Sequence, residues 1–121
     1  MSDRLTWLFR ILFAVALVAG TYLALAPAPA RLPGFDVSDK IEHMLGLAVL
    51  AFLLDRSQPS ARWGYWQLTA PLLFAYGGLI EILQSFTPNR SPELLDLLAD
   101  GLGIVLYGLL RQPLGRVLRL A

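Results

Sequence analysis

The sequence predicts an all-α membrane protein: a bundle of four transmembrane helices, with both termini in the cytoplasm and a polar cluster at the extracytoplasmic side. Three observations lead to this prediction. Hydrophobic residues make up 56% of the 121-residue chain, and its mean hydropathy of +0.59 is too high for an ordinary soluble domain. The apolar residues fall into four runs. Positive charges gather on alternate connections between these runs, as expected for a multi-pass protein of the inner (cytoplasmic) membrane.

The first helix is expected over residues 5–26, within a single domain that covers residues 1–121. It follows two arginines and ends before Pro27, and the aliphatic stem of Arg10 can reach back to the membrane interface. Small residues between positions 24 and 30 also fit the cleavage site of a secretory signal peptide. The length of the apolar run favours a membrane anchor, and the sequence leaves open whether the segment is removed.

The other three helices are expected over residues 39–56, 66–86 and 92–110. The second begins with Asp39 and has Glu42 three residues later, a spacing that resembles a capping box. It is short for a hydrocarbon core of about 30 Å, so we expect local thinning of the bilayer or a helical extension beyond its end. The third has the length of a full span. The fourth follows a serine and a proline that suit a helix N-terminus.

The orientation of the bundle follows from its lysines and arginines. Seven of the ten lie in the N-terminus, in the connection between the second and third helices, and in the C-terminus, so these parts are predicted to be cytoplasmic. Most of the acids lie on the opposite side. The seven predicted cytoplasmic cations are Arg4, Arg10, Arg56, Arg62, Arg111, Arg116 and Arg119, and the other three are Arg31, Lys40 and Arg90.

Polar residues gather where the second helix starts, the third ends and the fourth starts. Antiparallel threading puts these three ends on the same outer side of the membrane, so their side chains can meet. Charged groups inside a span are costly and usually face a bundle interior, a polar cavity or a partner. The candidate catalytic residues are Glu81, His43 and Asp100, and the candidate binding residues are Lys40, Gln84, Arg90 and Asp96.

Two interpretations of this cluster remain open. In the first it forms a polar cleft that opens outward and binds or transforms a ligand. In the second it is a structural network in which the cations neutralise the acids and fix the packing of three helices. His43 illustrates the choice, because it could accept a proton near neutral pH or simply make a hydrogen bond within the packing.

Several kinds of site are not supported by the sequence. No zinc-binding or cysteine-rich pattern is present, so we expect no metal and no other cofactor. A formal net charge of +1 gives no reason to expect nucleic acid. A transporter would need an oligomer, because four short helices leave no room for inverted repeats. The expected partners are the lipid bilayer and either a lipid-linked envelope intermediate or another membrane protein.

Three segments resemble the VanZ-like family of membrane proteins, named for a teicoplanin-resistance protein. They are Asp39 to His43, Glu81 to Arg90 and Asp96 to Gly103, and their order and spacing follow the family across about residues 38 to 110. The Glu-x-x-Gln that begins at Glu81, followed by Pro-x-Arg, is the most specific part. Asp100 departs from the pattern, which often has Asn there, and the extra acid makes the predicted cleft more negative.

The resemblance implies an integral membrane protein of the cell envelope that binds or modifies a cell-wall or lipid-linked molecule and lowers sensitivity to lipoglycopeptides such as teicoplanin. It implies no established reaction, so the sequence does not decide whether the protein is an enzyme. The alternative is a non-catalytic interaction or scaffold protein whose buried ion pairs are structural.

Overall fold

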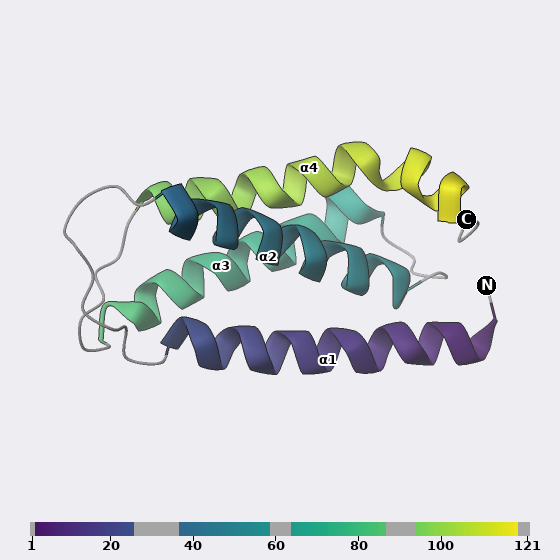
Figure 1. Ribbon diagram of the computed structural model, residues 1–121, viewed down its shortest axis with the longest axis horizontal. Helices are drawn as coiled ribbons and strands as arrows, with labels where there is room; N and C mark the ends of the chain where they lie inside the picture. Colours follow the sequence, from purple (N-terminus) through teal and green to yellow (C-terminus); the bar gives the residue numbers. More distant parts are fainter. Residues whose placement is uncertain (1, 26–36, 59–63, 87–93, 119–121) are drawn as a thin grey trace.

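The structure, a computed structural model, describes residues 2–25, 37–58, 64–86 and 94–118. These residues form four α-helices and a short π-helical segment, which confirms the expected all-α four-helix bundle. Successive helices run in opposite directions, and the N and C termini lie at the same end of the bundle (Figure 1). The elements are α1 (Asp3–Leu25), α2 (Val37–Arg56), η1 (Tyr65–Thr69), α3 (Ala70–Gln84) and α4 (Leu94–Leu118).

Helix α4 continues well past the expected end at residue 110 and contains Pro113 in its last turns. A proline in a helix interior removes one backbone hydrogen bond and normally favours a helix end. Here tertiary contacts hold the extension, because Arg111 bonds to Asp55 and Gly115 packs against Arg56, both on α2. The expectation that the helix stops at 110 was therefore wrong, since packing outweighs local propensity.

The bundle is built around the pair formed by α2 and α4, which pack along most of their shared length. Gly103 permits this approach, because a β-carbon there would collide with the carbonyl oxygen of Met44 on α2. Ala99, one turn earlier on α4, is also buried. The small-xxx-small spacing of Ala99 and Gly103 therefore serves close helix packing, as such pairs do in membrane bundles.

Aromatic rings link the helices at the end of the bundle that carries the termini. Phe9 of α1 meets Phe52 of α2 edge-to-face with 5.6 Å between ring centroids, and Phe52 meets Tyr107 of α4 in the same way at 5.8 Å. Tyr107 in turn contacts Tyr65 at 5.3 Å. Edge-to-face geometry is favourable for aromatic pairs, so this chain of rings links α1, α2, α4 and η1.

The outer faces of the helices are strongly apolar. Val18, Leu102 and Leu109 are examples, with 61–69% of their surface exposed. Within the described residues, two segments are long and apolar enough to cross a membrane, namely Asp3–Leu25 and Tyr65–Gln84. That criterion uses length and composition only, and buried core helices and signal sequences meet it too. Helices α2 and α4 carry several charged side chains and do not meet it.

Candidate functional site

Five ionisable residues from three helices meet near the end of the bundle where α2 and α4 begin. We call them the polar cluster. Each of its carboxylates is more than nine-tenths buried, although the helices around them are largely apolar. The structure thus brings together all three residues predicted as catalytic and two of those predicted for binding. The polar cluster consists of Lys40 and His43 on α2, Glu81 on α3, and Asp96 and Asp100 on α4.

Lys40 and Asp96 form the shortest ion pair of the polar cluster. The ammonium Nζ lies 2.5 Å from Asp96 Oδ1, and both side chains are about nine-tenths buried. Charge-assisted hydrogen bonds of this kind are stronger than neutral ones, and in a low-dielectric interior each partner depends on the other. The pair therefore ties the first turns of α2 and α4 together and neutralises one of the three carboxylates.

His43 lies between the two aspartates of α4. Its Nδ1 is 3.0 Å from Asp100 Oδ1, and its Nε2 is 3.8 Å from Asp96 Oδ2. A carboxylate that accepts a hydrogen bond from Nδ1–H fixes the orientation and tautomer of the ring and leaves Nε2 as the basic nitrogen. This arrangement can accept and hold a proton, which is the requirement for a general base.

Gly77 on α3 makes room for the Asp100 carboxylate. A β-carbon at position 77 would lie 2.6 Å from Asp100 Oδ2, well inside van der Waals contact. Asp100 is 2% exposed, so its carboxylate is enclosed between α2 and α3. Gly77 on α3 thus has a specific function in the site: it lets α3 approach the acid on α4.

Glu81 completes the polar cluster from α3. His43, Glu81 and Asp96 each offer one atom that can coordinate a metal, and these three atoms lie within 4.8 Å of one another. The three residues have the spacing that a metal site requires. One oxygen of Asp96 already bonds to Lys40, and a cation beside a metal ligand opposes the binding of a second positive charge. The expectation of no metal therefore stays a prediction, which can be tested directly.

Gln84 lies on α3 one helical turn beyond Glu81. Gln84 is buried, and its side-chain amide donates a hydrogen bond of 2.8 Å to the backbone oxygen of Ala24, so it connects α3 to α1. It also lines an open cavity together with His43 and Asp100. Arg90, predicted as a binding residue, lies outside the described residues.

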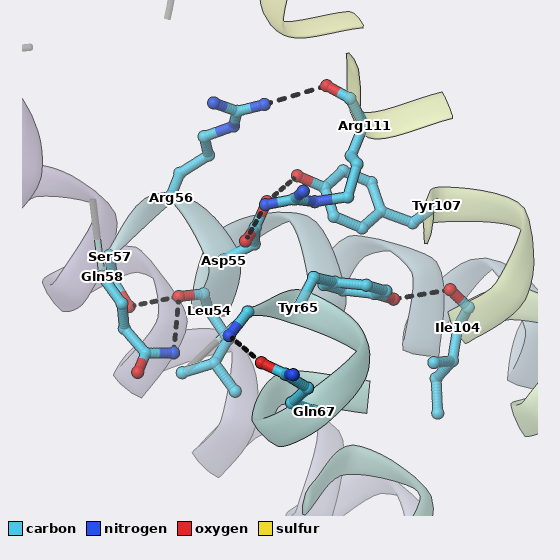
Figure 2. Close-up of polar contacts among 11 residues, drawn as sticks. Leu54, Asp55, Arg56, Ser57, Gln58, Tyr65, Gln67, Ile104, Tyr107 and Arg111 are labelled. Atoms are coloured by element: carbon cyan, nitrogen blue, oxygen red, sulfur yellow. Dashed lines mark hydrogen bonds and ion pairs between the residues drawn. The ribbon is translucent and has the colours of Figure 1, made fainter. Parts of the chain in front are cut away.

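A second polar network at the other end of α2 was not anticipated from the sequence. Arg111 binds Asp55 through two nitrogens, at 2.9 and 3.2 Å, and Tyr107 donates its hydroxyl to the same carboxylate at 2.6 Å (Figure 2). Tyr65 lies beside this group and donates to the backbone oxygen of Ile104. We call Asp55, Tyr107 and Arg111 the Asp55 network.

The Asp55 network had a weak signal in the sequence. Asp55 is one of two acids on the side that is otherwise rich in arginine, and Tyr107 and Arg111 are four residues apart on one helix face. Nothing local connects residue 55 with residues 107 and 111, so the pairing could be found only from the tertiary structure. Its bidentate geometry is typical of structural ion pairs.

The fold and the site together define an all-α helix bundle with a polar cluster enclosed by three of its helices. Comparison of the chain with models of protein families, with curated proteins and with solved structures finds no match. The geometry of the polar cluster and of the surfaces around it therefore carries the functional argument.

Proposed function

We propose that the chain is a VanZ-like integral protein of the inner membrane that uses the polar cluster to bind or modify the polar part of a lipid-linked envelope molecule. Lowered sensitivity to lipoglycopeptides is the expected consequence. The observation that carries the proposal is the burial of three carboxylates, a lysine and the chain's single histidine at the contact of α2, α3 and α4.

The surfaces of the helices support a membrane location. Large apolar side chains are exposed on all four helices, including Ile11 on α1, Leu45 on α2, Leu79 on α3 and Leu106 on α4. Soluble monomeric proteins rarely expose contiguous apolar surface on this scale. In the proposed topology both termini are cytoplasmic, and the polar cluster lies at the extracytoplasmic ends of α2, α3 and α4. The Asp55 network then lies at the cytoplasmic end.

The composition of the polar cluster supports a binding or proton-transfer function. Formally it contains three carboxylates against one lysine, with His43 able to take up a proton. Buried ion pairs are often no more stabilising than apolar packing, so a bundle that needed only stability would gain little from them. Ionisable groups at membrane depth generally mark sites of function.

The test compares two buried acids, one in each network. Glu81→Gln should abolish the lowering of teicoplanin sensitivity while the protein reaches the membrane at its normal level. Asp55→Asn should instead reduce membrane abundance, because it weakens a bidentate structural pair. Asp3→Asn, which changes an exposed acid at the far end, is the control that should alter neither quantity. If Glu81→Gln still lowered teicoplanin sensitivity as much as the wild type does, the proposal would be contradicted.

The second candidate function is a non-catalytic scaffold, and the pairing of Lys40 with Asp96 and of His43 with Asp100 favours it. In a scaffold the polar cluster only specifies helix packing. Glu81→Gln would then lower the melting temperature in detergent, and any change in sensitivity would follow protein abundance. If the variant is as stable as the wild type, the buried acid is not there for folding, and the ligand-binding function is favoured.

A further inference from the structure

An open groove of about 650 Å³ lies beside the polar cluster, between α1, α2 and α3. Its walls come from residues 16–24 of α1, 42–50 of α2 and 76–84 of α3. Helices α1 and α2 are close at the end that carries the termini, where Phe9 packs on Phe52, and they separate towards the end where α2 begins (Figure 1). The groove occupies the part where they have separated.

On its α3 side the groove is closed by two hydrogen bonds. Thr21 and Tyr76 share one between their hydroxyls at 2.5 Å, and Gln84 donates to the Ala24 carbonyl at 2.8 Å. Since α1 is fastened to α3 at this level, the opening lies between α1 and α2. Exposed Leu23 and Leu45 stand on the two sides of that opening. In a membrane, an opening with such borders faces hydrocarbon rather than water.

Two glycines keep the groove wide. Gly20 on α1 and Gly46 on α2 both line it, and a β-carbon added at either position would meet no atom within 4 Å. These glycines therefore do not serve close helix packing, unlike Gly103. Their effect is to leave space in opposite walls of the same cavity.

The lining of the groove is acidic. It includes the exposed Glu42 and the buried Asp100, and no lysine or arginine is found among the described residues that line it. His43 and Gln84 add groups that can form hydrogen bonds. Charge complementarity therefore favours a ligand whose polar end is positively charged and whose remainder is apolar.

We propose that this groove binds a membrane lipid with an amine headgroup, the acyl chain lying along the apolar walls and the ammonium group facing Glu42 and Asp100. The lipid arrives sideways from the bilayer, between α1 and α2. This inference rests on the proposed function insofar as it requires the chain to span a membrane. It extends that function by naming the chemical class of the ligand and its route of access.

The experiment measures lipid retained by the full chain. The protein is reconstituted in vesicles that contain equal amounts of phosphatidylethanolamine and phosphatidylglycerol with identical acyl chains, extracted in mild detergent, and examined by native mass spectrometry. The wild type should retain phosphatidylethanolamine in preference to phosphatidylglycerol. Gly46→Leu fills the groove and should reduce the retained lipid by about tenfold. Gly20→Leu, from the opposite wall, should do the same.

Gly78→Leu is the matched control. Gly78 also has open space around its α-carbon but does not line the groove, so its variant should retain lipid like the wild type. Glu42→Gln changes an exposed residue and should weaken the preference for the amine lipid without a loss of folding. Equal retention of the two lipids by the wild type, or normal retention in both groove-filling variants, would overturn the proposal.

Failure of this proposal can be distinguished from failure of the proposed function. Glu81 does not belong to the groove lining, so Glu81→Gln should retain lipid normally even if it loses the effect on teicoplanin sensitivity. If lipid retention proves nonspecific while Glu81→Gln still abolishes that effect, the groove assignment is wrong and the function of the polar cluster stands. If instead lipid retention is specific but Glu81→Gln still lowers teicoplanin sensitivity, the proposed function is wrong and the lipid site stands.

Discussion

Gly77 on α3 faces the carboxylate of Asp100 on α4 so closely that a β-carbon at position 77 would lie 2.6 Å from Asp100 Oδ2. Gly77→Ala should therefore destabilise the protein, by roughly 1–3 kcal/mol, because an added methyl group overpacks an enclosed site. The free energy of unfolding in detergent measures this effect. In a double-mutant cycle, Asp100→Ala should remove most of the penalty, whereas additive effects of the two substitutions would show that the contact is not energetically important.

Substitution of Gly103, where α2 and α4 approach each other closely, should be tolerated even less well than substitution of Gly77. A β-carbon at Gly103 would meet the backbone of Met44, which cannot move aside as a side chain can, so Gly103→Ala should lower the melting temperature by several degrees. Gly78→Ala is the control in a neighbouring helix. It has open space and should gain roughly 0.5–1 kcal/mol from the better helix propensity of alanine. Similar effects of the two substitutions would contradict the close packing of α2 on α4.

The Asp55 network should behave as a stabilising element. Tyr107→Phe removes a hydroxyl that donates to the Asp55 carboxylate at 2.6 Å and leaves the ring in place, so it should cost about 1.5–3 kcal/mol of stability. Tyr22→Phe removes a hydroxyl from an exposed tyrosine and should change stability by less than about 0.5 kcal/mol. Thermal unfolding of the two variants decides the question, and an equally small effect of both would rule out a structural function for the hydrogen bond.

The proposed topology can be tested with introduced cysteines, because the chain has none of its own. Phe86→Cys lies at the end of the bundle assigned to the extracytoplasmic side, and Gln112→Cys lies near the opposite end; both positions are exposed. A maleimide that cannot cross membranes should label the first in intact cells and the second only after the membrane is opened. Labelling of Gln112→Cys in intact cells would reverse the orientation.

Divalent metal should not stabilise the protein. Lys40 holds one oxygen of Asp96, and its positive charge beside that carboxylate opposes the binding of a divalent cation. Addition of Zn²⁺ or Mn²⁺ should leave the melting temperature within about a degree of that in EDTA, since a bound ligand would raise it. A rise that disappears in His43→Gln would instead identify a metal site at the polar cluster.

Much of the candidate site was predictable because its residues follow from helix periodicity and threading. His43 and Lys40 share one face of α2, and Asp96 and Asp100 share one face of α4. Up-and-down threading of the chain starts both helices at the same end of the bundle, which was enough to predict their contact. Gln84 was placed at the correct end, but its hydrogen bond to the backbone of α1 could not be predicted, because a backbone carbonyl carries no sequence signal. Arg90, another predicted member, lies outside the described residues.

The sequence by itself determined the number and order of the helices and the gathering of polar groups at one end, because hydrophobic runs, prolines and helical spacing act locally along the chain. Only the tertiary structure decided which groups pair, how far α4 extends beyond Pro113, and where a groove remains between α1 and α2. The Asp55–Arg111 ion pair joins residues that are 56 positions apart. Such contacts depend on the rotation and separation of packed helices, which are fixed by the fit of many side chains at once and not by any one segment.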